Sequence, residues 1–259
     1  ELDAYSCRHG LGYTILTGEK NGIRAQQELF VPRGDACEID RLTLENKTDA
    51  PRTLDVFSYV EFCLWDAMDD SSNFQRNFST GEVEVVGNAI YHKTEYRERR
   101  DHYAVFWANT PVTSFDTARD AFCGVYGGPA EPEAVKAGRC SNSIAHGWAP
   151  GGAHHFHLTL EAGETRTILF GLGYIENPVD EKFTAPGVIN KTRAEAMMAR
   201  YATDAQVDEA SRALADHWDK LLSTLQLHSG DEKLDRMVNL WHQYQCMVTF
   251  NMSRSASYY

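Results

Sequence analysis

Short segments of alternating apolar and polar residues fill the first two thirds of the 259-residue chain. Alternation of this kind puts every second side chain on one face, so it predicts strands with one buried face. Clusters of turn residues separate the segments. The predicted strands are Gly12–Thr17, Gly22–Val31, Glu38–Glu45, Thr53–Phe62, Glu82–Val86, Ala89–Thr94, Tyr103–Ala108, Ala153–Glu161 and Thr165–Tyr174.

Many strands at short spacing, with Gly-rich turns and no intervening helices, are typical of an antiparallel β-sandwich. Gly18–Gly22 predicts a hairpin between the first two strands, and Gly87 with Asn88 predicts another between the fifth and the sixth. Residues 115–152 hold Gly, Pro and Ala without a clear period. We expect long loops there, with one or two short strands.

The pattern changes near Asn177, where helical spacing begins. Thr192–Ala202 is rich in helix formers, and from Asp204 apolar residues recur every three or four positions over about 20 residues, which predicts an amphipathic helix. Asp231 is a suitable N-cap for one more helix that ends near Asn251. We therefore expect a mainly β fold with C-terminal helices. The expected division is residues 1–176 as a β-sandwich domain, 177–230 as a helical linker and 231–259 as the start of a further domain.

The chain is acidic, with 25 Lys and Arg against 37 Asp and Glu and a formal charge of −12. A field of this sign repels nucleic acid, whereas a neutral sugar is indifferent to it. No apolar run of about 18 residues is present, so we expect no membrane partner. The 6 cysteines show no CxxC pair and predict reduced thiols of a cytoplasmic protein. The chain begins without Met or a signal sequence and we expect a fragment, cut at both ends.

Two groups of residues are candidate metal sites. On a strand, His155 and His157 share a face and His154 points the other way, so two imidazoles could bind zinc. No third ligand follows at a supportive spacing, and histidines on a sheet surface are the simpler interpretation. The acidic residues near Asp66 do not form a calcium loop, because Met68 occupies a ligand position and the turn glycine is missing.

Residues 65–77 form a predicted loop that is rich in amides and carboxylates, with aromatic residues between them. Such groups pair with sugar hydroxyls while rings cover the apolar face of a sugar, so Asp66 and Asn73 are candidate sugar ligands. A solvated loop is the alternative. Tyr96–Asp101 is a mixed-charge run that predicts a salt-bridged surface turn, with an interface as the alternative. The chain has no nucleophile or phosphate-loop motif and no recognisable pair of catalytic carboxylates, so it holds no complete active site.

Several segments of unusual composition resemble the cellobiose phosphorylases of glycoside hydrolase family 94. They are Cys7–Thr14, Glu61–Trp65, Asn73–Asn77, Ser79–Val85, Tyr91–Asp101 and Asn251–Tyr259. The resemblance spans nearly the whole chain and is weakest over residues 115–152. It implies a super-sandwich of the galactose-mutarotase type, a helical linker and the first helix of an (α/α)6 catalytic barrel.

The resemblance also implies a reaction. Enzymes of this kind convert a disaccharide such as cellobiose and inorganic phosphate into α-glucose 1-phosphate and glucose, with inversion and without a cofactor. One carboxylic acid protonates the glycosidic oxygen while phosphate attacks the opposite face, so a single catalytic carboxylate suffices. That acid is expected beyond Tyr259, which implies that this chain alone is inactive.

Three residues are carried over as substrate-binding candidates. Arg254 resembles the arginine that holds the non-reducing glucosyl unit, a role that suits a guanidinium because its fork donates to two hydroxyls. Asp66 and Asn73 lie in the segment that resembles the loop reaching the active-site entrance of the partner in a homodimer. The alternatives are a non-catalytic carbohydrate-binding or dimerisation module, a phosphorylase for cellodextrin or another β-glucoside, and a hydrolase relative.

Overall fold

The computed structural model describes residues 1–62, 81–94, 102–147 and 149–253. The chain divides into two compact units, Glu1–Asp208 and Glu209–Tyr259, and each is described by itself. Among the described helices, none is long and apolar enough to cross a membrane.

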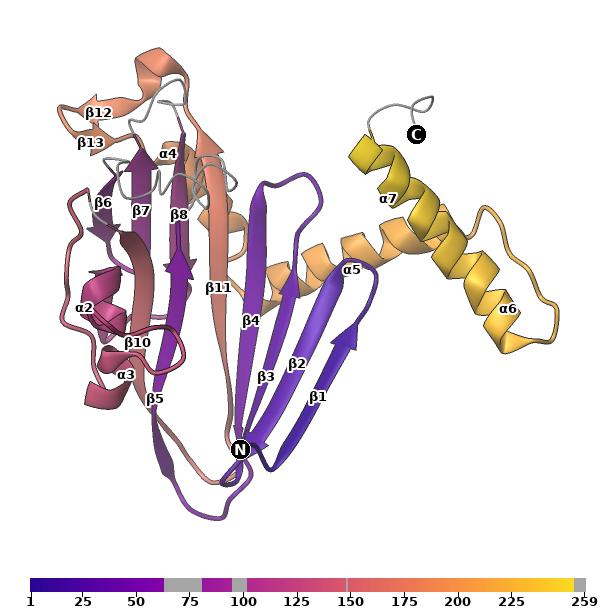
Figure 1. Ribbon diagram of the computed structural model, residues 1–259, viewed down its shortest axis with the longest axis horizontal. Helices are drawn as coiled ribbons and strands as arrows, with labels where there is room; N and C mark the ends of the chain where they lie inside the picture. The colour runs from indigo at the N-terminus through magenta and orange to yellow at the C-terminus, as the bar shows by residue number, and fades with distance from the viewer. Residues whose placement is uncertain (63–80, 95–101, 148, 254–259) are drawn as a thin grey trace. The chain divides into compact units, whose positions relative to one another are not determined.

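The first unit is built on two antiparallel sheets (Figure 1). The 8-stranded sheet has the order β1-β2-β3-β4-β11-β8-β7-β6, and the 3-stranded sheet has the order β5-β10-β9. The strands are β1 (Ala4–His9), β2 (Tyr13–Lys20), β3 (Ile23–Phe30), β4 (Cys37–Asn46), β5 (Arg52–Glu61), β6 (Gly81–Val86), β7 (Ala89–Thr94), β8 (His102–Ala108), β9 (Ser114–Ala118), β10 (Pro150–Leu160) and β11 (Thr165–Glu176).

All of the strands predicted from alternation are confirmed, and so is the sandwich. Both predicted hairpins are antiparallel pairs, with Lys20 opposite Ile23 in one and Val86 opposite Ala89 in the other. Strand β1 was not predicted. Residues 115–152 contain the predicted short strand, β9, but also two short helices that were not predicted, α2 (Arg119–Cys123) and α3 (Glu133–Ala137).

The main core lies between the two sheets. Apolar side chains from both sheets meet there, among them Ile90, Phe106, Phe156, Leu160 and Ile168, each at most 4% exposed. Full burial of one such side chain contributes about 1.5–3 kcal/mol. The apolar residues at every second position of these strands thus form the face that points into the core.

Helices α2 and α3 cover the outer face of the 3-stranded sheet (Figure 1). Phe122 of α2 stacks on Tyr59 of β5, with ring centroids 4.6 Å apart, and lies 6.3 Å from the ring of Phe57. A second small core forms around these rings. It explains why two helices of only five residues form here, since short helices depend on packing rather than on propensity.

Two glycines of β11 make room on the outer face of the larger sheet. A Cβ atom at Gly171 would lie 2.1 Å from the ring of Trp107, and one at Gly173 would lie 2.7 Å from the sulfur of Met197. Met197 belongs to α4 (Thr192–Arg200), which was predicted and packs on this face (Figure 1). The absence of side chains at both positions thus allows an indole and a helix to approach the strand closely.

Three short elements precede α4: the 3-10 helix η2 (Val179–Glu181) and the two-stranded pair β12 (Phe183–Ala185) and β13 (Val188–Ile189). Lys93 of β7 anchors them, because its ammonium group donates to the carbonyl of Gly187 at 2.5 Å. The same group pairs with Glu82 at 2.8 Å and with Glu84 at 3.3 Å. A lysine only 2% exposed therefore keeps its charge fully paired.

The predicted amphipathic helix is α5 (Asp204–Leu222), which begins in the first unit and continues into the second. The second unit continues with α6 (Glu232–Arg236), the π-helix η3 (Met237–His242) and α7 (Gln243–Ser253). Asp231 caps α6, as predicted, by accepting from the backbone N–H groups of Lys233 and Leu234. The single helix predicted after Asp231 is thus present as three consecutive helical segments. The middle one, η3, is a π-helix, which the spacing of apolar residues did not predict.

Candidate functional site

The three residues predicted to bind substrate, Asp66, Asn73 and Arg254, lie outside the described residues. So do the rest of the loop at 65–77 and the charged run Tyr96–Asp101. The candidate site is therefore built from the described residues alone, and the roles of these three remain predictions.

Two histidines lie near the strand ends where the described chain stops at residues 62 and 94 and resumes at 102. His92 stacks on Phe62, with centroids 4.9 Å apart and planes 1° from parallel. Burial and the nearby His102 lower the pKa of His92 to about 4, so the ring is neutral at pH 7. The ring of His102 lies 5.6 Å from that of Tyr174, whose hydroxyl donates to Glu176. The neutral ring of His92 thus packs on the ring of Phe62 close to the strand ends.

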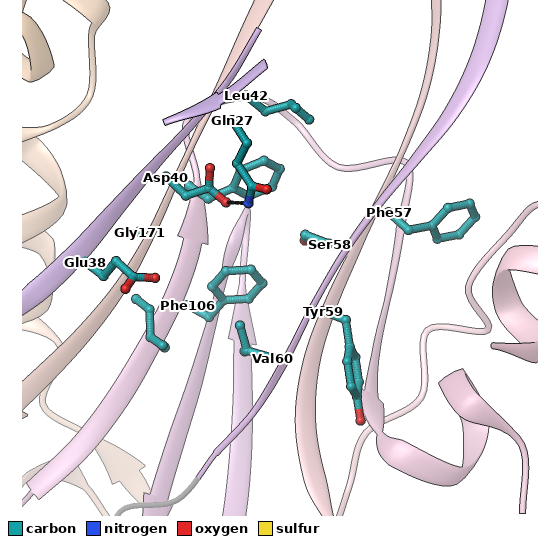
Figure 2. Close-up of a pocket in the computed structure, with 12 residues that line it drawn as sticks. Gln27, Glu38, Asp40, Leu42, Phe57, Ser58, Tyr59, Val60, Phe106 and Gly171 are labelled. Atoms are coloured by element: carbon teal, nitrogen blue, oxygen red, sulfur yellow. Dashed lines mark hydrogen bonds between the residues drawn. The ribbon is translucent and has the colours of Figure 1, made fainter. Parts of the chain in front are cut away.

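A cleft of about 300 Å³ opens between the two sheets of the first unit (Figure 2). Its walls come from β3, β4, β8 and β11 on one side and from β5 on the other. Its lining combines carboxylates, a carboxamide, a hydroxyl and phenyl rings. The lining residues are Gln27, Glu38, Asp40, Leu42, Phe57, Ser58, Tyr59, Val60, Phe106, Phe170, Gly171 and Leu172.

Asp40 is a carboxyl group of the cleft whose pKa is raised. Burial raises its pKa from 3.8 to about 6; a hydrogen bond from Gln27 opposes this rise and the charge of Glu38 adds to it. The amide Nε2 of Gln27 donates to Oδ2 of Asp40 at 2.6 Å (Figure 2). The other oxygen, Oδ1, is buried and has no hydrogen-bond partner among the described residues. The cleft therefore contains a carboxylate with unused acceptor capacity.

The opposite wall of the cleft carries the hydroxyl group of Ser58, which contacts His154. Oγ of Ser58 lies 3.4 Å from Nδ1 of His154 and accepts from the backbone N–H of the same histidine at 3.3 Å. His154 points away from the face of His155 and His157, as predicted, and its ring stacks on Phe106 with centroids 4.6 Å apart. The interpretation as a surface histidine is wrong for it, because it is only 1% exposed. Burial lowers the pKa of His154 to about 3, so it remains neutral.

The other two histidines of this strand share the outer face, as predicted from the alternation. Both approach one carboxylate oxygen, because Nε2 of His155 and Nδ1 of His157 each lie 2.8 Å from Oδ1 of Asp55. These contacts hold the pKa of Asp55 below its usual value. Nδ1 of His155 lies 2.8 Å from the hydroxyl of Ser114, which also accepts from a backbone N–H at 3.1 Å. Both imidazoles are thus engaged within the sheet, and the described residues contain no cluster suited to a metal ion.

Sequence reasoning missed Gln27, Asp40 and Glu38. The signal lay in β4, where Ile39 and Leu42 are three residues apart, so strict alternation breaks between them. Because Asp40 and Leu42 are two residues apart on a strand they share one face, and Leu42 packs on the core between the sheets. A polar residue on a core-facing position is a sign of a functional or specially paired group.

The two facing sheets, followed by helices, place the chain among the large antiparallel β-sandwiches. Comparison of the sequence with protein families gives a finer result. The supersandwich domain of glycosyl hydrolase 94 matches residues 1–204, and the catalytic domain of the glycosyl hydrolase 94 superfamily matches residues 217–259. The chain belongs to glycosyl hydrolase family 94.

Several of the relatives are named as phosphorylases, and one is named as a cyclic β-(1,2)-glucan synthase. The chain is 33% identical to the N,N'-diacetylchitobiose phosphorylase of Vibrio furnissii over 98% of its own length, and 29% identical to the solabiose phosphorylase of Paenibacillus borealis over 98%. It spans only 30% and 31% of those two proteins. Among solved structures, the GH92 α-mannosidase of Bacteroides thetaiotaomicron is similar over 87% of this chain and 26% of the mannosidase, with 12% identity and a TM-score of 0.42.

Proposed function

We propose that the chain is part of an inverting disaccharide phosphorylase that converts cellobiose and inorganic phosphate into α-glucose 1-phosphate and glucose. The observation that carries the proposal is the order of the two family matches, a supersandwich at 1–204 followed by the catalytic domain from 217. Phosphate as co-substrate agrees with the names of the relatives, which are phosphorylases of different disaccharides. Those names differ in the sugar, so cellobiose rests on the resemblance of the sequence segments, and cellodextrin or another β-glucoside is the alternative.

The proposed mechanism needs one carboxylic acid, which protonates the glycosidic oxygen while phosphate attacks the anomeric carbon from the opposite face. We place this acid outside the chain, beyond Tyr259, so the chain alone is expected to be inactive. Arg254 is proposed to hold the non-reducing glucosyl unit. Asp66 and Asn73 are proposed to lie near the acceptor at the active-site entrance of the partner subunit in a cytoplasmic homodimer.

The proposed division of the chain is a sandwich at 1–176, a helical linker at 177–230 and the first barrel helix at 231–259. Apolar side chains on the last helices support the third part. Within the second unit Met237 is 47% exposed, Trp241 52% and Phe250 63%. Apolar side chains that are this exposed and follow one another along one helix require a covering partner, which the remainder of a catalytic domain would supply. The same exposure disfavours a finished binding or dimerisation module.

The test uses the full-length protein that carries this chain. It is incubated with cellobiose and phosphate, and α-glucose 1-phosphate is measured with phosphoglucomutase and a dehydrogenase. We expect phosphate-dependent product from the full-length protein and none from the 259-residue chain. Phosphate-independent release of two glucose molecules would instead identify a hydrolase, and product formation by the chain alone would refute the placement of the acid.

A further inference from the structure

The described lining of the cleft between the sheets includes none of the residues proposed to bind substrate. It is lined entirely by residues of the first unit, from Gln27 to Leu172. The proposed catalytic role of the chain makes no use of it. Three features of its chemistry indicate a ligand.

First, the polar groups of the cleft are mostly acceptors. Asp40 and Glu38 are two residues apart on β4 and lie on the same face. The negative charge of Glu38 raises the pKa of Asp40, because like charges repel each other at short distance. Gln27 donates one amide hydrogen to Asp40 and carries a carbonyl oxygen of its own. Acceptors that exceed donors match a ligand with several hydroxyl groups.

Second, a buried acceptor has no partner. Oδ1 of Asp40 has lost contact with solvent, and the described residues offer it no donor. A buried polar atom without a partner costs about 1–3 kcal/mol, and more when it is charged. Folded proteins retain such an atom chiefly where a ligand or an ordered water satisfies it.

Third, the described lining of the cleft includes apolar side chains and carries no basic residue. The ring of Phe106 lies between the carboxylate wall and Val60 of the opposite strand (Figure 2). Among the described residues that line the cleft, none is Lys, Arg or His. Two carboxylates without a counter-charge repel phosphate esters and sugar acids. A volume of about 300 Å³ lies at the lower limit for ligand pockets and suits one six-membered ring rather than two.

We propose that this cleft is a carbohydrate-binding site for one neutral pyranose unit, with Asp40 and Gln27 bonded to its hydroxyl groups and the partly buried side chains of Leu42, Val60 and Leu172 against its apolar face. A rotation of the Asp40 side chain brings Oδ1 to the cleft, where it and Glu38 accept from the sugar hydroxyls, and Ser58 lies on the opposite wall. The site holds sugar without reacting with it. It would give the sandwich a contact to carbohydrate that does not depend on the catalytic domain.

The test measures binding of methyl β-glucoside to the 259-residue chain by saturation-transfer NMR and by a chemical-shift titration. We expect millimolar affinity, which falls at least tenfold in Asp40→Asn and in Gln27→Ala. The matched control is Glu45→Gln, a carboxylate on the same strand that pairs with Arg24 on the other face, and it should bind like the wild type. Circular dichroism verifies that each variant is folded.

Two charged analogues test the chemistry. Glucuronate should not bind, because its carboxylate meets Asp40 and Glu38. Glucosamine should bind no more than a few times more tightly than the neutral glucoside. No binding of the glucoside, equal binding by Asp40→Asn, or binding of glucosamine alone would overturn the proposal, the last by showing a cation site. Since no step involves phosphorolysis, failure here leaves the proposed activity untouched.

Discussion

The buried carboxylate of Asp40 predicts a measurable dependence of stability on pH. Its pKa is about 6 in the folded chain against an ordinary value of 3.8. A carboxyl with a raised folded-state pKa stabilises the fold while it is protonated, so this contribution is complete below pH 3.8 and is lost as pH rises through 6. Because a tenfold change in proton affinity corresponds to about 1.4 kcal/mol, ionised Asp40 lowers the free energy of unfolding by on the order of 3 kcal/mol.

Asp40→Asn removes this titration while it preserves the shape of the side chain. We expect the free energy of unfolding of the variant, relative to wild type, to increase by about 2–3 kcal/mol between pH 4 and pH 7. The free energy of unfolding of the variant can also differ from that of wild type by a constant amount, because the new amide needs its own hydrogen-bond partner. The quantity to compare is therefore the slope of the free energy of unfolding against pH. Urea unfolding followed by circular dichroism at several pH values between 4 and 7.5 measures it.

Glu45→Gln is the control, since the side chain of Glu45 is 36% exposed and pairs with Arg24 at 3.4 Å. It should change the free energy of unfolding by less than about 1 kcal/mol, without a slope difference between about pH 4 and pH 6. Parallel wild-type and Asp40→Asn curves across the whole range would refute the reasoning. They would show that the carboxylate is solvated or paired in the folded chain.

Three further predictions concern packing, the second unit and the substrate. Gly171→Ala should lower the free energy of unfolding by at least about 2 kcal/mol, because its Cβ would enter an indole ring, whereas Gly128→Ala, with nothing within 4 Å, should be nearly neutral in the same urea titration. Asn239→Ala should loosen the second unit by about 1–3 kcal/mol, since its amide pairs with both backbone groups of Leu227 at 2.7 and 2.9 Å, and faster amide exchange at Leu227 would show it. In the full-length protein, Arg254→Ala should raise the KM for disaccharide at least tenfold with a smaller change in the KM for phosphate; unchanged disaccharide kinetics would exclude the proposed contact.

Alternation was a reliable guide where one face of a strand is buried. It failed for β1 (Ala4–His9), because every residue of that strand is exposed and no buried face imposes a pattern. It also failed for α2 and α3, whose formation depends on rings of a distant strand such as Tyr59. Local sequence cannot encode a helix of five residues that exists through tertiary packing.

The cleft illustrates a different limit. Strand β4 was predicted correctly, but its apolar residues change face between Ile39 and Leu42, and Asp40 shares with Leu42 the face that points toward the other sheet. The neighbours of Asp40 in the cleft depend on the order of the strands. Gln27 lies on the adjacent strand β3, and Ser58 lies on β5 in the other sheet. Sequence patterns fix which face a residue occupies, whereas the pairing of distant strands decides its neighbours.

The proposed activity is tested most directly by the stereochemistry of the product formed by the full-length protein. Proton NMR during incubation with cellobiose and phosphate should show the anomeric signal of α-glucose 1-phosphate appearing together with one equivalent of glucose. A β-configured phosphate ester, or glucose released without any sugar phosphate, would contradict the account.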